Sequence, residues 1–152
     1  NKMKYDRSWD KAEECFRNSI ALNPDFVKAH VGLADLYFDL CIIENIKYSG
    51  GDFYYIYTLN KPRPELMQEI IEEYMTAISL STGELGRNIL FRIFTVLCFQ
   101  KRFDQALEFA QILVSALPEE HAFQNCLKIA EELIERKTAP KKIEITTKAG
   151  LE

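Results

Sequence analysis

The chain has 152 residues, of which 47% are hydrophobic, which is enough for one compact domain with a core of its own. Its 19 basic and 23 acidic residues give a net charge of -4, so no overall positive field favours nucleic acid or an anionic membrane, and a basic ligand is slightly favoured over an acidic one. The longest apolar run, residues 89–99, is interrupted by Arg92 and is far shorter than the ~20 residues of a membrane-spanning helix.

Six helices are predicted, because apolar residues recur at intervals of three and four along most of the chain. Asn23-Pro24 ends the first helix, since proline disfavours helix in the residue before it, and Pro118 fits the first turn of the last one. The predicted helices cover residues 8–22, 25–46, 64–81, 84–100, 103–116 and 118–137.

Two segments depart from the helical pattern. Residues 47–63 contain Gly50-Gly51 and Pro62 around the aromatic string 53–57, and we interpret them as an insertion that forms a long connection or a short β element. Residues 138–152 lose the helical period and gain charge, which indicates a charged tail with room for a brief strand at residues 143–146. The final pair, residues 151–152, has the composition of a purification-tag remnant.

An internal repeat organises the helices. Trp9, Ala12, Phe16 and Pro24 are separated by 3, 4 and 8 residues, and the series Phe103, Ala106, Ala110 and Pro118 has the intervals 3, 4 and 8 again. Antiparallel helices approach closely only where a small side chain faces a large one, so such a schedule of large and small residues predicts stacked helix pairs.

These residues resemble the tetratricopeptide repeat (TPR) family, most closely over residues 8–37. The resemblance implies an all-α fold over residues 1–137, an α-solenoid of antiparallel helix pairs with about six helices and with the insertion between the helices of its middle unit. Ser19 and His30 depart from the residues usual in the family. The array starts in the middle of a unit, so we expect a longer parent protein that continues upstream.

In the TPR family the first helix of each unit lines a concave, peptide-binding face. Carried over to this sequence, the face and the aromatic insertion give these partner-binding candidates: Lys28, Val31, Asp35, Phe38, Asp39, Asn88, Phe91, Arg92, Thr95, Tyr54, Tyr55 and Tyr57. Val31 and Asp35 stand where chaperone-binding members carry a lysine and an asparagine, which disfavours a chaperone-tail adaptor. The alternative is that Phe38 and Phe91 only pack against the next helix.

The insertion concentrates aromatic side chains of the kind enriched in binding hot spots. We expect it to border the binding groove or to make a self-association contact, the alternative being that its rings fold back over the second helix. A homo-oligomer formed through the insertion or through an exposed N-terminal helix is a further possibility that the pattern leaves open.

No catalytic, cofactor-binding or metal site is predicted. His30 and His121 lie on different predicted helices without metal-ligand spacing, and the paired glutamates fall on amphipathic helices where solvated acids are expected. The four cysteines, which lack any CxxC pair, are interpreted as buried thiols in a reducing, cytoplasmic compartment rather than as a disulfide pair or metal site: Cys15, Cys41, Cys98 and Cys126.

The sequence therefore predicts a protein–protein interaction module, a scaffold or adaptor without enzymatic activity that binds a protein or peptide and neither nucleic acid nor membrane. The alternative function is a regulatory or sensory TPR domain of a larger bacterial transcriptional regulator or signalling enzyme, because residues 21–37 are similar to repeat arrays attached to such proteins.

Overall fold

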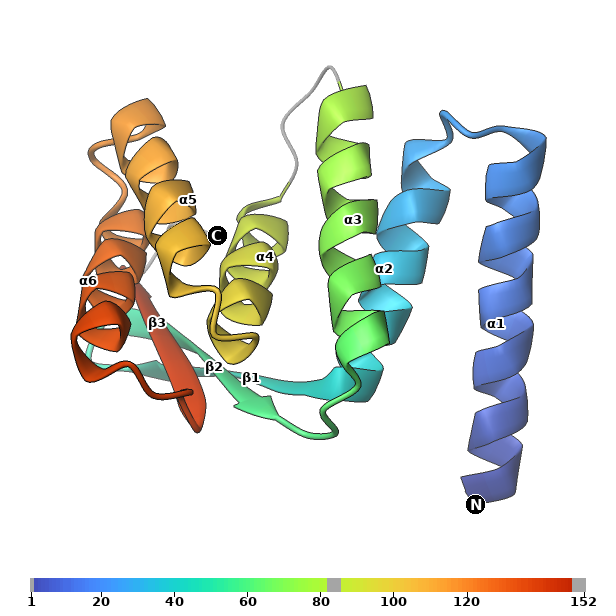
Figure 1. Ribbon diagram of the computed structural model, residues 1–152, viewed down its shortest axis with the longest axis horizontal. Helices are drawn as coiled ribbons and strands as arrows, with labels where there is room; N and C mark the ends of the chain where they lie inside the picture. Colours follow the sequence, from blue (N-terminus) through green and yellow to red (C-terminus); the bar gives the residue numbers. More distant parts are fainter. Residues whose placement is uncertain (1, 82–85, 149–152) are drawn as a thin grey trace.

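The computed structural model describes residues 2–81 and 86–148, with side chains from residue 8 onward, and these ranges hold six helices and three strands (Figure 1). The helices are α1 (Lys2–Leu22), α2 (Val27–Cys41), α3 (Pro64–Leu80), α4 (Arg87–Phe99), α5 (Phe103–Ala116) and α6 (His121–Arg136). The strands are β1 (Ile42–Ser49), β2 (Asp52–Leu59) and β3 (Lys142–Lys148). None of the described helices is both long enough and apolar enough to cross a bilayer.

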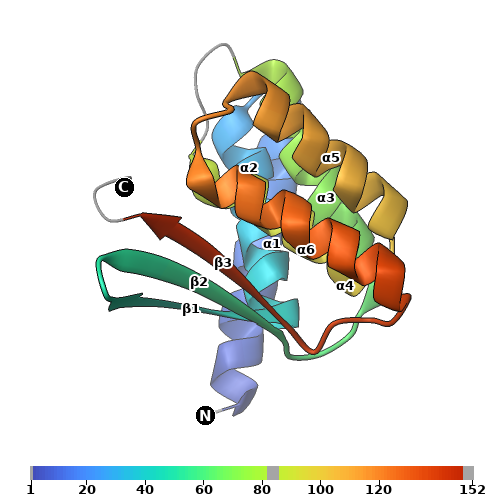
Figure 2. The ribbon, with the colours of Figure 1, turned by 90° about the vertical axis from the view of Figure 1, so that its left-hand side faces the viewer.

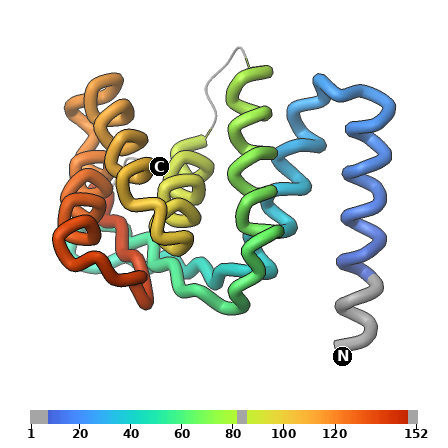
Figure 3. The backbone as a smooth tube through the Cα atoms, in the orientation of Figure 1, coloured from blue at the N-terminus to red at the C-terminus, as the bar shows by residue number. Residues whose placement is uncertain are grey.

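The helices form a row in chain order with alternating directions, and each contacts the next (Figure 3). The close approach of α1 and α2 depends on a large residue that faces a small one. An added Cβ at Gly32 would lie 2.4 Å from a ring carbon of Phe16, so any larger residue would require the ring or α1 to shift. This close contact between α1 and α2 is of the kind that the repeated spacing predicts, with a large side chain facing a small one.

The strands form an antiparallel sheet in the order β1-β2-β3. The two-residue turn Gly50-Gly51, with φ values of 61° and 89°, joins β1 to β2, because glycine adopts such positive φ angles without steric cost. In the register, Ile46 lies opposite Tyr55, and Tyr55 lies opposite Ile145 of β3. The third strand therefore comes from the far end of the chain.

The prediction of an all-α solenoid is wrong, because the protein is a mixed α/β structure with a three-stranded antiparallel sheet. The segment interpreted as a long connection or a short β element forms part of a β hairpin, and the brief strand expected at residues 143–146 of the tail is present as the longer β3. At the start of β1, Ile42, Ile43 and Ile46 continue the three-to-four spacing of the preceding helix, which conceals the change of structure. The partner of β2 lies too far along the chain for local patterns to reveal.

Several element boundaries differ from the predicted ones. The second helix ends at Cys41 instead of residue 46, because Ile42 has extended backbone angles, with φ of -136° and ψ of 136°. The last helix begins at His121, three residues after Pro118. Within the described residues the fourth helix begins at Arg87; the predicted start at residue 84 and the tag interpretation of residues 151–152 both lie outside them.

The sheet packs against α2, α4 and α6, with β3 nearest to α6 and β1 farthest from it (Figure 2). Aromatic rings make these contacts: Tyr57 lies edge-on to Phe38 at 5.9 Å, and Tyr55 lies 5.3 Å from Phe91, which in turn contacts Phe123. Helices and sheet thus share one core, and β2 covers Phe38 and Phe91, which were predicted to line an open concave face.

Candidate protein-interaction surface

The sheet buries five of the twelve side chains predicted to bind a partner. Phe38 contacts Tyr57 and Phe91 contacts Tyr55 where the helices meet the sheet. None of the five is more than 6% exposed: Phe38, Phe91, Thr95, Tyr55 and Tyr57. A partner could reach them only if the sheet left the helices, so in this fold they are core residues.

The other seven predicted residues remain partly or fully accessible. Lys28, Asp39 and Asn88 are exposed, whereas Val31, Asp35, Arg92 and Tyr54 are half-buried. The structure brings Asp35 and Arg92 into direct contact. It also adds to them two residues that the sequence reasoning missed, Glu44 on β1 and Tyr74 on α3.

Asp35, Glu44, Tyr74 and Arg92, which we call the Arg92 cluster, join α2, β1, α3 and α4. The Arg92 guanidinium donates from Nη1 to Asp35 Oδ1 at 2.7 Å and from Nη2 to Glu44 Oε1 at 2.5 Å. Nη1 also donates to the Tyr74 hydroxyl at 3.1 Å, and that hydroxyl donates to Asp35. The guanidinium lies 4.6 Å from the ring centre of Phe38, so this buried charge has both polar and aromatic partners.

The Arg92 cluster leaves negative charge in excess. Asp39, one helical turn after Asp35, is exposed, and within the described residues its carboxylate has no hydrogen-bond or ion-pair partner. Partial removal of the Asp39 carboxylate from water raises its pKa, Arg92 lowers it, and the carboxylates of Asp35 and Glu44 raise it further, so the net shift is upward. Three carboxylates therefore share a single guanidinium at the junction of α2 and β1.

β1 leaves one edge of the sheet unpaired. The opposite edge, on β3, faces α6, where the Asn125 side chain accepts a hydrogen bond of 2.7 Å from the Thr146 backbone N–H. In the part of the chain that the structure describes, β1 pairs with β2 alone. An open edge strand of eight residues is a ready site for pairing with another chain.

The face of the sheet that packs on the helices becomes uncovered along β1. Paired residues of adjacent strands share a face, so Ile46 and Tyr48 belong to the same face as the buried Tyr55 and Ile145. Tyr55 and Ile145 are at most 6% exposed, whereas Ile46 is 58% and Tyr48 is 60% exposed. Tyr48 contacts Phe53 across the hairpin, at 4.9 Å between ring centres.

We call the open edge, with Ile43, Ile46 and Tyr48, the β1 edge. Sequence reasoning identified the aromatic character of the insertion but missed both isoleucines and the strand that carries them. One signal was available in the sequence: two glycines between runs rich in isoleucine and aromatic residues favour a two-residue hairpin.

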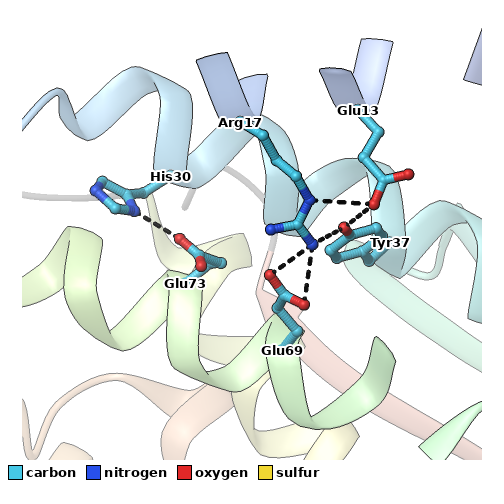
Figure 4. A network of polar contacts seen from close by, with 6 residues as sticks. All are labelled: Glu13, Arg17, His30, Tyr37, Glu69 and Glu73. Atoms are coloured by element: carbon cyan, nitrogen blue, oxygen red, sulfur yellow. Dashed lines mark hydrogen bonds and ion pairs between the residues drawn. The ribbon is translucent and has the colours of Figure 1, made fainter. Parts of the chain in front are cut away.

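Polar contacts fix the helices that support β1 (Figure 4). Arg17 of α1 donates to the Tyr37 hydroxyl of α2 at 2.5 Å and to Glu69 of α3 at 3.0 and 3.2 Å. Next to this group, His30 of α2 has Glu73 Oε1 2.5 Å from Nδ1 and the Pro24 carbonyl oxygen 2.7 Å from Nε2. Burial alone would lower the pKa of His30, but these hydrogen bonds outweigh it and raise the pKa above 6.5.

Two shallow cavities lie away from β1. One, of about 350 Å³, lies among α3, α4 and α5, and Met75 and Ile112 at its rim are exposed. The other, of about 460 Å³, lies between the end of α6 and the segment before β3. Cys41, Cys98 and Cys126 are buried free thiols and Cys15 is exposed, and the described residues contain no group of three acids, histidines or cysteines placed to hold a metal ion.

No protein-family model matches this sequence, and no curated protein is similar to it.

Proposed function

We propose that this chain is a protein-binding module in which helix pairs of tetratricopeptide type support a sheet, and that it binds its partner at the β1 edge. The observation that carries the proposal is the grouping of exposed apolar side chains. Eight large apolar residues are exposed in the described ranges, and Ile43, Ile46 and Tyr48 all fall on one strand. Exposed apolar groups gathered on an open edge are typical of interaction sites.

Anchors at the start of β1 support this proposal. Ile42 is buried directly after α2, and Glu44 is fixed by Arg92, so the strand leaves the helices in a defined direction. A preorganised surface loses less conformational entropy on binding than a loop would. The acidic group beside the strand favours a partner with basic residues there.

Burial in the core accounts for the raised pKa values of several titratable groups. Burial raises the pKa values of Tyr57, Tyr74 and Cys98, which lie in the core. These three buried side chains contribute to the packing between secondary-structure elements. We place the module in the cytoplasm, a proposal supported by the buried free thiols Cys41, Cys98 and Cys126.

The test compares two surface variants in affinity capture from the source cells. I43S/I46S/Y48S removes the apolar groups of the β1 edge, and M75S/I112S removes a similar exposed apolar surface from the cavity among α3, α4 and α5. Deleting the whole insertion is unsuitable, since Tyr55 and Tyr57 belong to the core. Circular dichroism checks that both variants are folded.

We expect the wild type and M75S/I112S to capture the same proteins in similar amounts, and I43S/I46S/Y48S to lose at least one of them by about tenfold or more. Equal capture by all three proteins would contradict binding at the β1 edge. Loss of capture in M75S/I112S alone would place the binding surface at the cavity among α3, α4 and α5 instead.

A further inference from the structure

The backbone of β1 presents hydrogen-bonding groups along its open edge. In a two-residue hairpin the residues that flank the turn, here Ser49 and Asp52, direct their backbone N–H and C=O groups toward each other. Because the direction alternates along a strand, the backbone groups of Glu44, Ile46 and Tyr48 point away from β2. An added strand would find these three residues ready to pair.

The side chains next to that edge define what a fourth strand would have to carry. Glu44, Ile46 and Tyr48 share the face that is directed at the helices, as their partners Tyr57, Tyr55 and Phe53 do. Residues directly opposite one another in an antiparallel pair have Cβ atoms about 4.5–5.5 Å apart. Positions opposite Ile46 and Tyr48 therefore favour apolar side chains, which would cover groups that are now exposed.

The position opposite Glu44 favours a basic side chain. Asp35 and Glu44 both bind the Arg92 guanidinium, and the Asp39 carboxylate interacts electrostatically with Arg92 and with both of these carboxylates. A lysine or arginine on an added strand would bring a second positive charge close to these three carboxylates, in addition to that of Arg92. Charge complementarity at such a position contributes mainly to the specificity of binding.

We infer that the partner adds an extended strand antiparallel to β1, with apolar residues opposite Tyr48 and Ile46 and a lysine or arginine opposite Glu44. The recognised pattern, from amino to carboxyl end, is apolar, any, apolar, any, basic. This inference rests on the proposed function and specifies its binding mode. Strand addition of this kind obtains affinity from backbone hydrogen bonds and specificity from alternate side chains.

A second copy of the chain fits this edge poorly. In an antiparallel two-fold pairing of β1 with itself, the residues that face the helices would again be Ile42, Glu44, Ile46 and Tyr48. None of them is basic, so each copy would leave its carboxylates without a new partner. Charge therefore favours a different protein over self-association.

The test uses a fluorescein-labelled peptide with the core Val-Thr-Val-Thr-Lys and measures its binding to the full chain by fluorescence anisotropy. We expect replacement of the peptide lysine by glutamate to weaken binding about tenfold. D39N should weaken the lysine peptide several-fold. D104N, which removes another exposed aspartate on α5, should leave its affinity unchanged.

Backbone methylation separates strand addition from other modes of binding. N-methyl groups on one alternate set of peptide amides would face β1 and abolish binding, whereas methyl groups on the other set would face solvent and be tolerated. On the protein, I46P removes the N–H of Ile46 from the open edge, and I46A removes only the side chain. We expect I46P to weaken binding at least tenfold more than I46A does.

Three results would overturn the inference: no binding of the lysine peptide, equal effects of both methylation sets, or a dimer of the wild type that I46P dissociates in analytical ultracentrifugation. If the peptide fails while I43S/I46S/Y48S still loses a captured partner, binding at the β1 edge stands without strand addition. If that variant captures normally and the peptide also fails, both proposals fall.

Discussion

At the scale of single residues, Gly32 shows that packing, and not helix propensity alone, determines which residue occupies a position in a helix. Glycine inside a helix costs about 1 kcal/mol relative to alanine, yet a Cβ here would lie 2.4 and 2.6 Å from ring carbons of Phe16. We expect Gly32→Ala to lower the free energy of unfolding by about 1–3 kcal/mol, because α1 or the ring must shift. Urea denaturation followed by circular dichroism measures the change.

The control for Gly32 is the same substitution without the ring. In the Phe16→Ala background, the extra methyl group has room, so Gly32→Ala should be neutral or should stabilise by up to about 1 kcal/mol through helix propensity. Equal costs in both backgrounds would mean that the contact with Phe16 does not explain the glycine.

His30 makes the stability of the protein depend on pH. Both ring nitrogens face oxygen acceptors, Glu73 Oε1 and the Pro24 carbonyl, so both can donate only when the ring is protonated. The folded state raises the pKa of His30 above 6.5 despite the opposing effect of burial. The stabilisation is therefore complete below pH 6.5 and is lost as the pH rises through the folded-state pKa.

We expect the free energy of unfolding of the wild type to fall as the pH is raised from about 6 to 9, and His30→Gln to lack this part of the dependence. Urea denaturation at each pH gives both curves. His121→Gln, which changes the other histidine, serves as the control and should retain the wild-type slope. If His30→Gln and the wild type have parallel curves, the contact between His30 and Glu73 does not couple protonation to stability.

At the scale of elements, the turn between β1 and β2 holds the binding edge in position through backbone geometry alone. Gly50 and Gly51 have φ values of 61° and 89°, and a Cβ added to either would have no atom within 4 Å. Asparagine tolerates the first of these conformations, whereas a β-branched residue is strained at a positive φ. The effect of a substitution here should therefore follow φ preference and not side-chain contacts.

We expect Gly50→Asn to change the melting temperature by no more than 2–3 °C, and Gly51→Val to destabilise the protein by about 1–3 kcal/mol. Differential scanning calorimetry measures both. Gly51→Val should also weaken peptide binding at the β1 edge if the hairpin orders that edge. Equal melting temperatures for the two variants would indicate that the turn is not held in this conformation.

The helices and strands also differ in how well local sequence patterns predict them. Apolar spacing located the six helices, because each packs one face on its neighbours and carries that period in its own residues. The same spacing hid β1, since Ile42, Ile43 and Ile46 extend the period of α2. A brief strand was expected within the tail at residues 143–146, but its pairing with β2 depends on the whole fold and could not be predicted from those residues.

Sequence patterns likewise predicted some features of the candidate site and missed others. Asp35 and Arg92 were placed on the predicted concave face by the resemblance to a repeat family, and the structure brings them into contact with each other. Phe38, Phe91 and Thr95 were assigned to the same surface, but all three are buried. The contacts of Tyr57 with Phe38 and of Tyr55 with Phe91 agree with the alternative in which the rings of the insertion fold back over the helices. The exposed Ile46 was missed because exposure of an apolar residue on a strand depends on where the neighbouring helices end.

At the scale of the whole molecule, the sheet connects helices that a simple row would couple only to their neighbours. In a repeat array each unit contacts adjacent units, so distant ends can unfold separately. Here β3 follows α6, pairs with β2 and contacts α6, while β1 continues directly from α2. The sheet therefore provides a second connection between the two halves of the row, in addition to the contacts of α3, α4 and α5.

Ile145 tests this connection, because it is fully buried in β3 while the single tryptophan, Trp9, packs against Tyr37 at the other end of the row. We expect Ile145→Ala to cost about 2–5 kcal/mol and to shift the urea midpoint equally by Trp9 fluorescence and by circular dichroism, because the molecule unfolds as one unit. Glu144→Ala removes only a surface contact with Lys142 and should change the free energy of unfolding by less than about 1 kcal/mol. If Ile145→Ala shifts the circular dichroism transition but leaves the Trp9 transition in place, α1 and α2 unfold independently of the sheet, and the β1 edge would then be supported by the helices nearest to it and not by the fold as a whole.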